Sequence, residues 1–269
     1  MSNTPRATFG LVGLNVVVFL LANHVFADSE ISAFGLPLYF PLNDHFHLWQ
    51  FVTSLFMHAN LSHLFMNMFG LVSFGSILER MWGPKRFVIF YIVAGLGAGL
   101  IHNAVGYFSY SETVSALAEQ GVTVEVAERL NGAMDPRSFF YQLQRDFPEA
   151  VRSVGQEKVV DLFYTFHVPV VGASGAIYGI LTAFGLMFPN AKLSLIFLPV
   201  PIAAKYFIPG LLLMDLFSGV TGVSLFGGGI AHFAHVGGAV IGFLLMWVWR
   251  SRVPDPRLER GGGQIRIGG

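Results

Sequence analysis

Six long apolar stretches constrain this chain more than any other feature of its sequence. A helix needs roughly 20 apolar residues to cross the hydrocarbon core of a bilayer, because each residue adds only about 1.5 Å. The fifth stretch is short and the second is long, but we expect all six to cross. The chain is therefore predicted to be an all-α polytopic membrane protein with a bundle of six transmembrane helices, over residues 7–26, 49–78, 87–108, 168–188, 206–220 and 230–249.

Composition supports a membrane protein and excludes several other classes. Of the 269 residues, 54% are hydrophobic and only 12% are charged, about half the charged fraction of a typical soluble domain. The formal net charge is zero, and no segment concentrates enough basic charge to neutralise a phosphate backbone. The chain has no cysteine, which removes disulfides, thiolate catalysis and cysteine metal sites. We expect membrane lipid as a partner and no nucleic acid.

The distribution of basic residues predicts the orientation in the membrane. With six spans, both termini lie on the same side. By the positive-inside rule that side is the cytoplasm, and the fourth and sixth spans start at the outer face. The compact core favours a bacterial inner membrane. The predicted inner side carries 11 of the 16 Lys and Arg residues: Arg6, Arg80, Lys85, Arg86, Lys192, Lys205, Arg250, Arg252, Arg257, Arg260 and Arg266.

One segment, residues 109–166, looks soluble and interrupts the apolar pattern. Asp135-Pro136 predicts a helix start, with Asp as the N-cap and Pro at the first helical position. We expect two or three short amphipathic helices on the outer side. The predicted organisation is three spans in 1–108, the insertion in 109–166, three spans in 167–250, and a disordered cytoplasmic tail in 251–269.

Two polar residues lie inside apolar spans at matching depth. Ser174 belongs to Gly172-Ala173-Ser174-Gly175 in the fourth span, and His235 lies in the sixth. Both are about five residues below the predicted outer boundary, or about 7 Å. An ionisable group in hydrocarbon is expensive and suggests function. A neutral imidazole can take a serine proton and later protonate a leaving amine, so Ser174 is a candidate nucleophile and His235 its general base and acid.

Small residues predict that the two helices touch. Gly175, Gly179 and Ala183 form a stripe on the fourth span, and Gly238 and Gly242 form one on the sixth. Such stripes let membrane helices approach closely. Alone, each stripe indicates packing only, and a lone membrane serine more often bonds its own helix. The pairing of Ser174 with His235 favours the catalytic interpretation.

Further polar residues could complete this site. Tyr178 follows Ser174 by one turn and could stack on the imidazole. His63 and Asn67 are four residues apart, so they share a helix face and could aim two donors at an oxyanion, beside the Ser174 N–H. Asp215 is expected to lie at a different depth, and His58 to face away from His63. The contributions of Asp215, His58 and His232 stay open, although His232 could share a proton network with His235.

Together these motifs resemble those of the rhomboid family of intramembrane serine proteases. The resemblance implies a Ser174–His235 dyad, an oxyanion hole from the Ser174 N–H, His63 and Asn67, and cleavage of transmembrane protein substrates at or near the outer membrane surface. It implies structural roles for Glu79 and Gly83. The motifs are His58-x4-His63-x3-Asn67, Gly172-Ala173-Ser174-Gly175 with Tyr178, and Ala234-His235-x2-Gly238-x3-Gly242.

The chain departs from the family pattern in two places, and two other functions stay open. The family often has Trp-Arg before the second span, where this chain has Trp49-Gln50, and the insertion is longer than in a minimal core. An inactive rhomboid-like protein that binds membrane clients is one alternative. The other is a metal transporter or metalloprotease built from histidines, for which the chain lacks the usual carboxylates. We expect no cofactor and no metal. The histidines in question are His58, His63, His102, His232 and His235.

Overall fold

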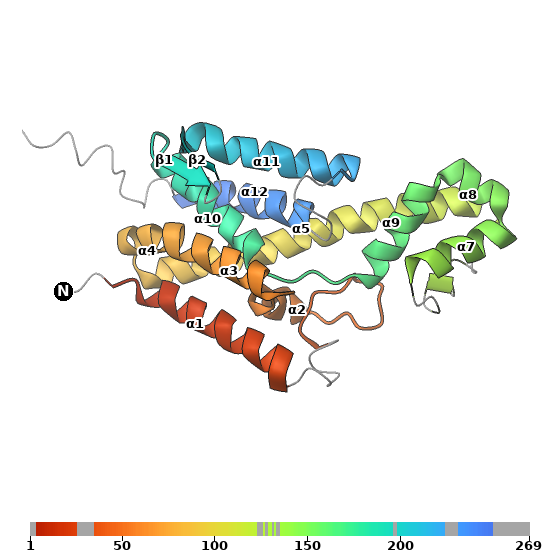
Figure 1. Ribbon diagram of the computed structural model, residues 1–269, viewed down its shortest axis with the longest axis horizontal. Coiled ribbons are helices and arrows are strands. Elements are labelled where there is room, and N and C mark those ends of the chain that lie inside the picture. The colour runs from red at the N-terminus through yellow and green to blue at the C-terminus, as the bar shows by residue number, and fades with distance from the viewer. Residues whose placement is uncertain are drawn as a thin grey trace, which may run out of the picture.

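The structure, a computed structural model, is a bundle of helices with a smaller helical group at one end (Figure 1). It describes residues 4–25, 35–122, 126, 129–130, 132, 135–195, 198–223 and 231–249. The elements are α1 (Arg6–Leu20), η1 (Leu21–Val25), α2 (Gln50–Thr53), η3 (Ser54–Phe56), α3 (Leu61–Gly70), η4 (Leu71–Gly75), α4 (Ser76–Trp82), α5 (Pro84–Glu119), α7 (Pro136–Asp146), α8 (Pro148–Val154), α9 (Gln156–His167), α10 (Ser174–Met187), β1 (Lys192–Leu195), β2 (Leu198–Ala203), α11 (Ala204–Thr221) and α12 (His232–Trp249).

The predicted all-α polytopic membrane fold is confirmed. Within the described residues, four helical segments are long and apolar enough to cross a membrane: Arg6–Asn23, Leu61–Trp82, Pro84–Glu119 and His232–Trp249. α10 is apolar but has only 14 residues, and α11 has 18. The number of six crossing helices therefore stays a prediction. An antiparallel hairpin, β1–β2, joins α10 to α11 and was not expected.

Two predicted spans begin later than the apolar pattern suggested. The second span, expected from residue 49, is broken into α2 and η3, and α3 starts only after Asn60, whose side chain accepts the His63 N–H at 2.8 Å. The fourth span, expected from residue 168, starts at Ser174. Before it the chain is extended, because Val170 exchanges backbone hydrogen bonds with Leu38. Hydropathy could not locate these boundaries, since they depend on capping and long-range pairing.

The two glycine stripes meet as predicted, at the centre of the bundle. A Cβ added to Gly238 would lie 1.9 Å from the Gly175 carbonyl oxygen, and one added to Gly242 would lie 2.6 Å from the Gly179 Cα. α10 and α12 therefore touch backbone to backbone. α5 packs against both helices at this point, since a Cβ added to Gly175 would lie 2.5 Å from the Cβ of Ala98, and one added to Gly237 would lie 3.4 Å from the Ala98 Cα. This packing brings the starts of α10 and α12 together.

The N-terminal helix is fixed by a carboxylate from α4. Glu79 is buried and accepts the Ala7 N–H at 2.9 Å, the Thr8 N–H at 2.7 Å and the Thr8 hydroxyl at 2.7 Å. A negative charge at the N-terminus of α1 also complements its dipole. Gly83 follows with φ of +80°, a conformation that side chains rarely adopt. Both residues therefore have the structural roles expected of them.

The insertion is tied to the bundle by the longest helix. α5 has 36 residues, or about 54 Å at 1.5 Å per residue, against a hydrocarbon core of about 30 Å. α5 runs past residue 109, where the insertion was predicted to begin, and ends at Glu119, so the first residues of the insertion continue a membrane helix. The predicted start of α7 is confirmed: Asp135 accepts the N–H groups of Arg137 and Ser138.

A second hydrophobic core holds the insertion together. It is built by the end of α5 with α7, α8 and α9, and it lies at the opposite end of the molecule from α4 and the hairpin (Figure 1). Its fully buried members include Leu117, Leu130, Phe139, Leu143 and Val159. One earlier expectation, the disordered tail over 251–269, lies outside the described residues.

Candidate active site

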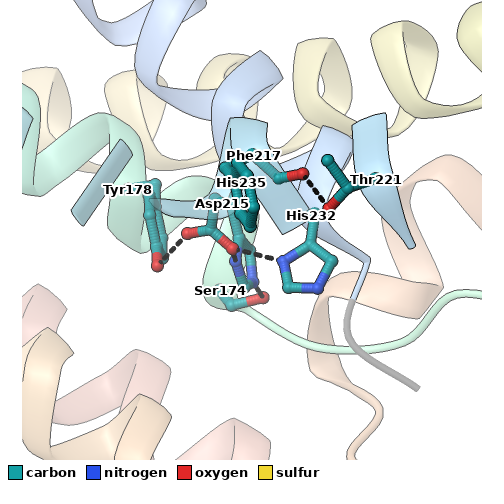
Figure 2. A network of polar contacts seen from close by, with 7 residues as sticks. All are labelled: Ser174, Tyr178, Asp215, Phe217, Thr221, His232 and His235. Atoms are coloured by element: carbon teal, nitrogen blue, oxygen red, sulfur yellow. Dashed lines mark hydrogen bonds and ion pairs between the residues drawn. The ribbon is translucent and has the colours of Figure 1, made fainter. Parts of the chain in front are cut away.

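Ser174 and His235 are in hydrogen-bonding contact. Ser174 is the first residue of α10, and His235 lies in the first turn of α12. The His235 Nε2 is 2.9 Å from the Ser174 Oγ (Figure 2), which is the range in which an imidazole can accept a hydroxyl proton. The expected pairing therefore exists at the level of the reacting atoms.

The loop before α10 presents the serine. Gly172 has φ of +122°, a conformation that side chains rarely adopt, and its N–H donates to the Ser54 carbonyl at 2.9 Å. A Cβ on Gly172 would lie 2.8 Å from the His63 Nε2 and 3.7 Å from the Ser174 Oγ. Only glycine fits between these groups without displacing them. The motif Gly172-Ala173-Ser174 therefore places the nucleophile candidate beside His63.

Tyr178 covers one face of the imidazole. Its ring stacks on that of His235 with centroids 4.2 Å apart and an angle of 11° between the planes. Its hydroxyl donates to the Asp215 Oδ2 at 2.5 Å. The phenol ring therefore limits rotation of the His235 ring, while its hydroxyl links α10 to α11.

The expectation that Asp215 lies remote from the site is wrong. Its Oδ1 is 3.1 Å from the His235 Nδ1 and 2.6 Å from the His232 Nδ1 (Figure 2). Asp215 precedes the end of α11 at Thr221 by six residues, or about 9 Å. That end lies on the side where α10 and α12 begin. The missed signal was the carboxylate itself, because an acidic residue inside an apolar helix is a functional candidate by default.

The contacts of Asp215 determine which ring nitrogen of His232 and of His235 carries a proton. Asp215 is 5% exposed, and an ionised carboxylate only accepts hydrogen bonds. Each histidine must therefore carry a proton on Nδ1 to bond it, an assignment inferred from the network. In the neutral ring this leaves the His235 Nε2 as an acceptor, facing the Ser174 hydroxyl. The carboxylate thus favours the tautomer that a general base requires.

The two side-chain donors expected for an oxyanion differ in their contacts. The His63 Nδ1 accepts the Ala59 N–H at 3.4 Å, which leaves its Nε2 protonated beside Gly172. Asn67 is buried and donates one amide hydrogen to the His63 carbonyl at 2.9 Å, so its second hydrogen is left for another acceptor. The Ser174 N–H lies at the start of α10, which no side chain in the described part of the chain caps, and such N–H groups lack helical partners.

His58 does not face away from this group. It is buried, and its ring centre lies 5.0 Å from that of His63 with the planes at 67°. The expectation assumed that both residues share one helix, but α3 begins only at Leu61. Helical spacing therefore does not apply to His58.

Gln50 anchors the loop at the position where the family resemblance led us to expect arginine. It is buried, and its Oε1 accepts the N–H groups of Tyr39 at 3.2 Å and His47 at 3.1 Å. Its Nε2 donates to the His45 carbonyl at 2.7 Å. The neutral amide thus ties both sides of the loop over 39–47 to α2, so anchoring does not require the arginine.

A known protein family matches the segments that carry these residues. The family model described as Rhomboid domain matches residues 45–119 and 151–252. The gap between the two matched parts lies inside the insertion. Both parts carry the contacts described above, with His63 and Asn67 in the first part and Ser174, Asp215 and His235 in the second.

Curated relatives resemble the chain over different lengths. Rhomboid protein 1, mitochondrial, of Saccharomyces cerevisiae is 26% identical over 96% of this chain and 58% of its own. Rhomboid protease GluP of Bacillus subtilis is 28% identical over 67% of this chain and 34% of its own length. Rhomboid protease AarA of Providencia stuartii is 26% identical over 88% of this chain and 70% of its own length. The chain thus spans less than two thirds of the length of the first two relatives.

Proposed function

Because this chain belongs to the rhomboid family, with its family match covering more than half of its residues, we propose that it is an intramembrane serine endopeptidase. Ser174 is the nucleophile, and His235 is the general base and acid. The substrates are transmembrane proteins, cut at or near the outer membrane surface. The observation that carries this proposal is the 2.9 Å contact between the Ser174 Oγ and the His235 Nε2.

In the first half of the reaction, the Ser174 Oγ attacks the carbonyl carbon of the substrate peptide bond. The hydroxyl proton passes to the His235 Nε2 as the new C–O bond forms. The negative charge moves to the carbonyl oxygen. The donors for it are the Ser174 N–H and the side chains of His63 and Asn67, and fixed donors of this kind stabilise the tetrahedral state. The stacked Tyr178 ring keeps the His235 ring in its orientation toward Ser174 during this step.

Collapse of the tetrahedral state breaks the C–N bond. His235 returns its proton to the departing amine, and an ester links the substrate acyl group to Ser174. Water then attacks the ester while His235 takes one of its protons. Expulsion of the Ser174 Oγ, which regains a proton from His235, releases the carboxylic acid and restores the enzyme. No cofactor enters this sequence.

The depth of the pair determines what can be cut. An intact helix hides its carbonyl groups in internal hydrogen bonds, so a substrate segment must be extended or unwound to reach Ser174. Helix-breaking Gly or Pro in the substrate should therefore help, and the family leads us to expect small side chains beside the cleaved bond. Replacing such helix breakers with leucine should slow cleavage, which time courses on paired substrates would measure.

The proposed location is a bacterial inner membrane, with both termini in the cytoplasm. In support, α4, the start of α5 and the hairpin lie at the end of the bundle away from the insertion (Figure 1). These elements carry Arg80, Lys85, Arg86 and Lys192, and short loops rich in Lys and Arg are typically cytoplasmic. The insertion and the Ser174–His235 pair then lie toward the outer side.

The test is cleavage of a model transmembrane substrate in liposomes by the wild-type chain and by Ser174→Ala. We expect cleavage by the wild type and none by the variant. A serine-directed phosphonate should label Ser174 in the wild type and not in His235→Ala. Wild-type protein that binds the substrate without cutting it, and takes up no phosphonate, would instead identify an inactive client-binding protein.

A further inference from the structure

We propose that Asp215 is a positioning residue that extends the Ser174–His235 pair to a serine–histidine–aspartate arrangement across three helices. This inference rests on the proposed function and deepens it. Each member comes from a different helix: Ser174 from α10, Asp215 from α11 and His235 from α12. Figure 2 shows the carboxylate on the side of the imidazole away from the serine.

The first argument is the order of contacts through the imidazole. The His235 Nε2 is 2.9 Å from the Ser174 Oγ, and its Nδ1 is 3.1 Å from the Asp215 Oδ1. One ring thus joins the hydroxyl to the carboxylate through its two nitrogens. The same three residue types, in the same roles, serve serine hydrolases on several unrelated folds. In its neutral form the ring cannot carry its proton on Nε2 without losing the Nδ1 hydrogen bond to Asp215.

The second argument is charge. When His235 takes the serine proton it becomes a cation inside a protein surrounded by lipid, where an unpaired charge is costly. Asp215 is 5% exposed and already in contact with the ring. Its negative charge therefore stabilises the cation when it forms, without moving. This effect is specific to the reacting state and should alter kcat more than substrate binding.

The third argument is that Asp215 is itself held in place. Besides His235, its oxygens accept a bond from the Tyr178 hydroxyl at 2.5 Å and from the His232 Nδ1 at 2.6 Å. A buried carboxylate is tolerated only when paired and hydrogen-bonded, and both groups provide this. His232 and Tyr178 thus orient the carboxylate, and the carboxylate orients His235.

The activity test compares Asp215→Asn, Asp215→Glu and Ser218→Ala in the full-length protein. An asparagine amide can donate to the His235 Nδ1, which would move the ring proton to Nε2 and leave no acceptor for the serine. We expect kcat to fall by about 10²- to 10⁴-fold, with KM within about twofold. Asp215→Glu should recover part of the loss because it keeps the carboxylate. Ser218, buried on the same helix, lies outside the network, so Ser218→Ala should cleave like the wild type.

A second measurement tests whether Asp215 positions His235 and does not depend on cleavage. Nitrogen-15 NMR of histidine-labelled protein reports which ring nitrogen of His235 carries the proton, with His235→Ala supplying the assignment. We expect a protonated Nδ1 in the wild type and in Ser174→Ala, and a protonated Nε2 in Asp215→Asn. An unchanged His235 tautomer in Asp215→Asn, or full activity of that variant, would overturn the inference. Absence of cleavage by the wild type would instead remove the proposed function, while the tautomer would still decide the role of Asp215.

Discussion

The membrane bundle and the insertion are held together by opposite means. In the bundle, α10 and α12 meet through glycine, backbone against backbone, and polar side chains lie inside. In the insertion, large apolar side chains such as Phe139 and Leu143 fill the interior, and charges lie outside. Lipid tails are as apolar as leucine, so hydrophobic burial cannot drive membrane helices together. Close packing and polar contacts must do so instead.

The charges of the insertion illustrate the contrast. Asp146 pairs with Arg129 and Arg145, each at 2.7 Å, on a partly exposed surface. Such pairs contribute little, because water competes for them. Asp215 in the bundle contacts two histidines and a tyrosine instead of arginines, and it is nearly buried. We therefore expect carboxylate contacts to contribute little in the insertion and much in the bundle, and the effects of substitutions should divide in the same way.

The largest expected effect is on catalysis in the bundle. His235→Ala should lower kcat by at least about 10⁴-fold, or about 5.5 kcal/mol of activation free energy, because no other described side chain is hydrogen-bonded to the Ser174 hydroxyl. His232→Ala is the matched control from the same helix and should retain part of the activity. Cleavage assays in liposomes measure both. Complete loss in His232→Ala with activity in His235→Ala would reverse the assignment of the base.

The next effect concerns packing. Gly238→Ala places a methyl group 1.9 Å from the Gly175 carbonyl oxygen, and rigid backbone cannot yield as a side chain would. We expect the free energy of unfolding to fall by at least about 3 kcal/mol, with loss of the Ser174–His235 contact. Gly10→Ala is the control, since a Cβ there meets nothing within 4 Å. Denaturation in detergent compares the two. Equal stability of both variants would contradict the backbone contact.

In the insertion, stability and catalysis should separate. Leu143 is fully buried in the second core, so Leu143→Ala should destabilise the insertion by about 3 kcal/mol through lost burial and a cavity. Tyr141→Ala on the same helix removes a side chain from an exposed position and should have little effect. Hydrogen exchange of α7–α9 reports stability, and phosphonate labelling reports Ser174. Loss of labelling in Leu143→Ala would show that the two regions are not independent.

The smallest expected effect is that of pH on the insertion. Hydrogen bonds from Arg145 and then Arg129 hold the pKa of Asp146 well below its ordinary range. A depressed pKa in the folded state means that the pair stabilises at neutral pH and loses this contribution as the pH falls below that ordinary range, about 3.9. The protection factors of the α7 amides against hydrogen exchange should therefore fall slightly more steeply in acid for the wild type than for Asp146→Asn. Parallel acid profiles would show that the pair contributes nothing.

How much the sequence could predict depends on the range of the interactions involved. The glycine stripes, the Asp135 cap and the position of Tyr178 one turn after Ser174 follow from helical periodicity and local hydrogen bonds, so the pattern was sufficient. The start of α10 depends on backbone bonds from Val170 and Gly172 to residues more than 100 positions away. Hydropathy carries no trace of such pairing, and it also gave no sign of the hairpin.

Asp215 is a different case, because its depth could have been counted from the end of its helix. What could not be counted is the rotation of α11 about its own axis. That rotation decides whether the carboxylate faces His235 or lipid, and it depends on packing against α10 and α12. His58 was misplaced for a related reason, since the helix assumed to carry it begins three residues later, at Leu61.

The long helix α5 joins the two regions mechanically. Near its middle, Ala98 touches the helices that carry Ser174 and His235, and near its C-terminal end Leu117 lies in the core of the insertion. After Pro84 no proline interrupts it, so one helix runs from the bundle into the insertion. α5 therefore sets where the insertion stands relative to the wall against which α10 and α12 pack, although each region is filled by its own core.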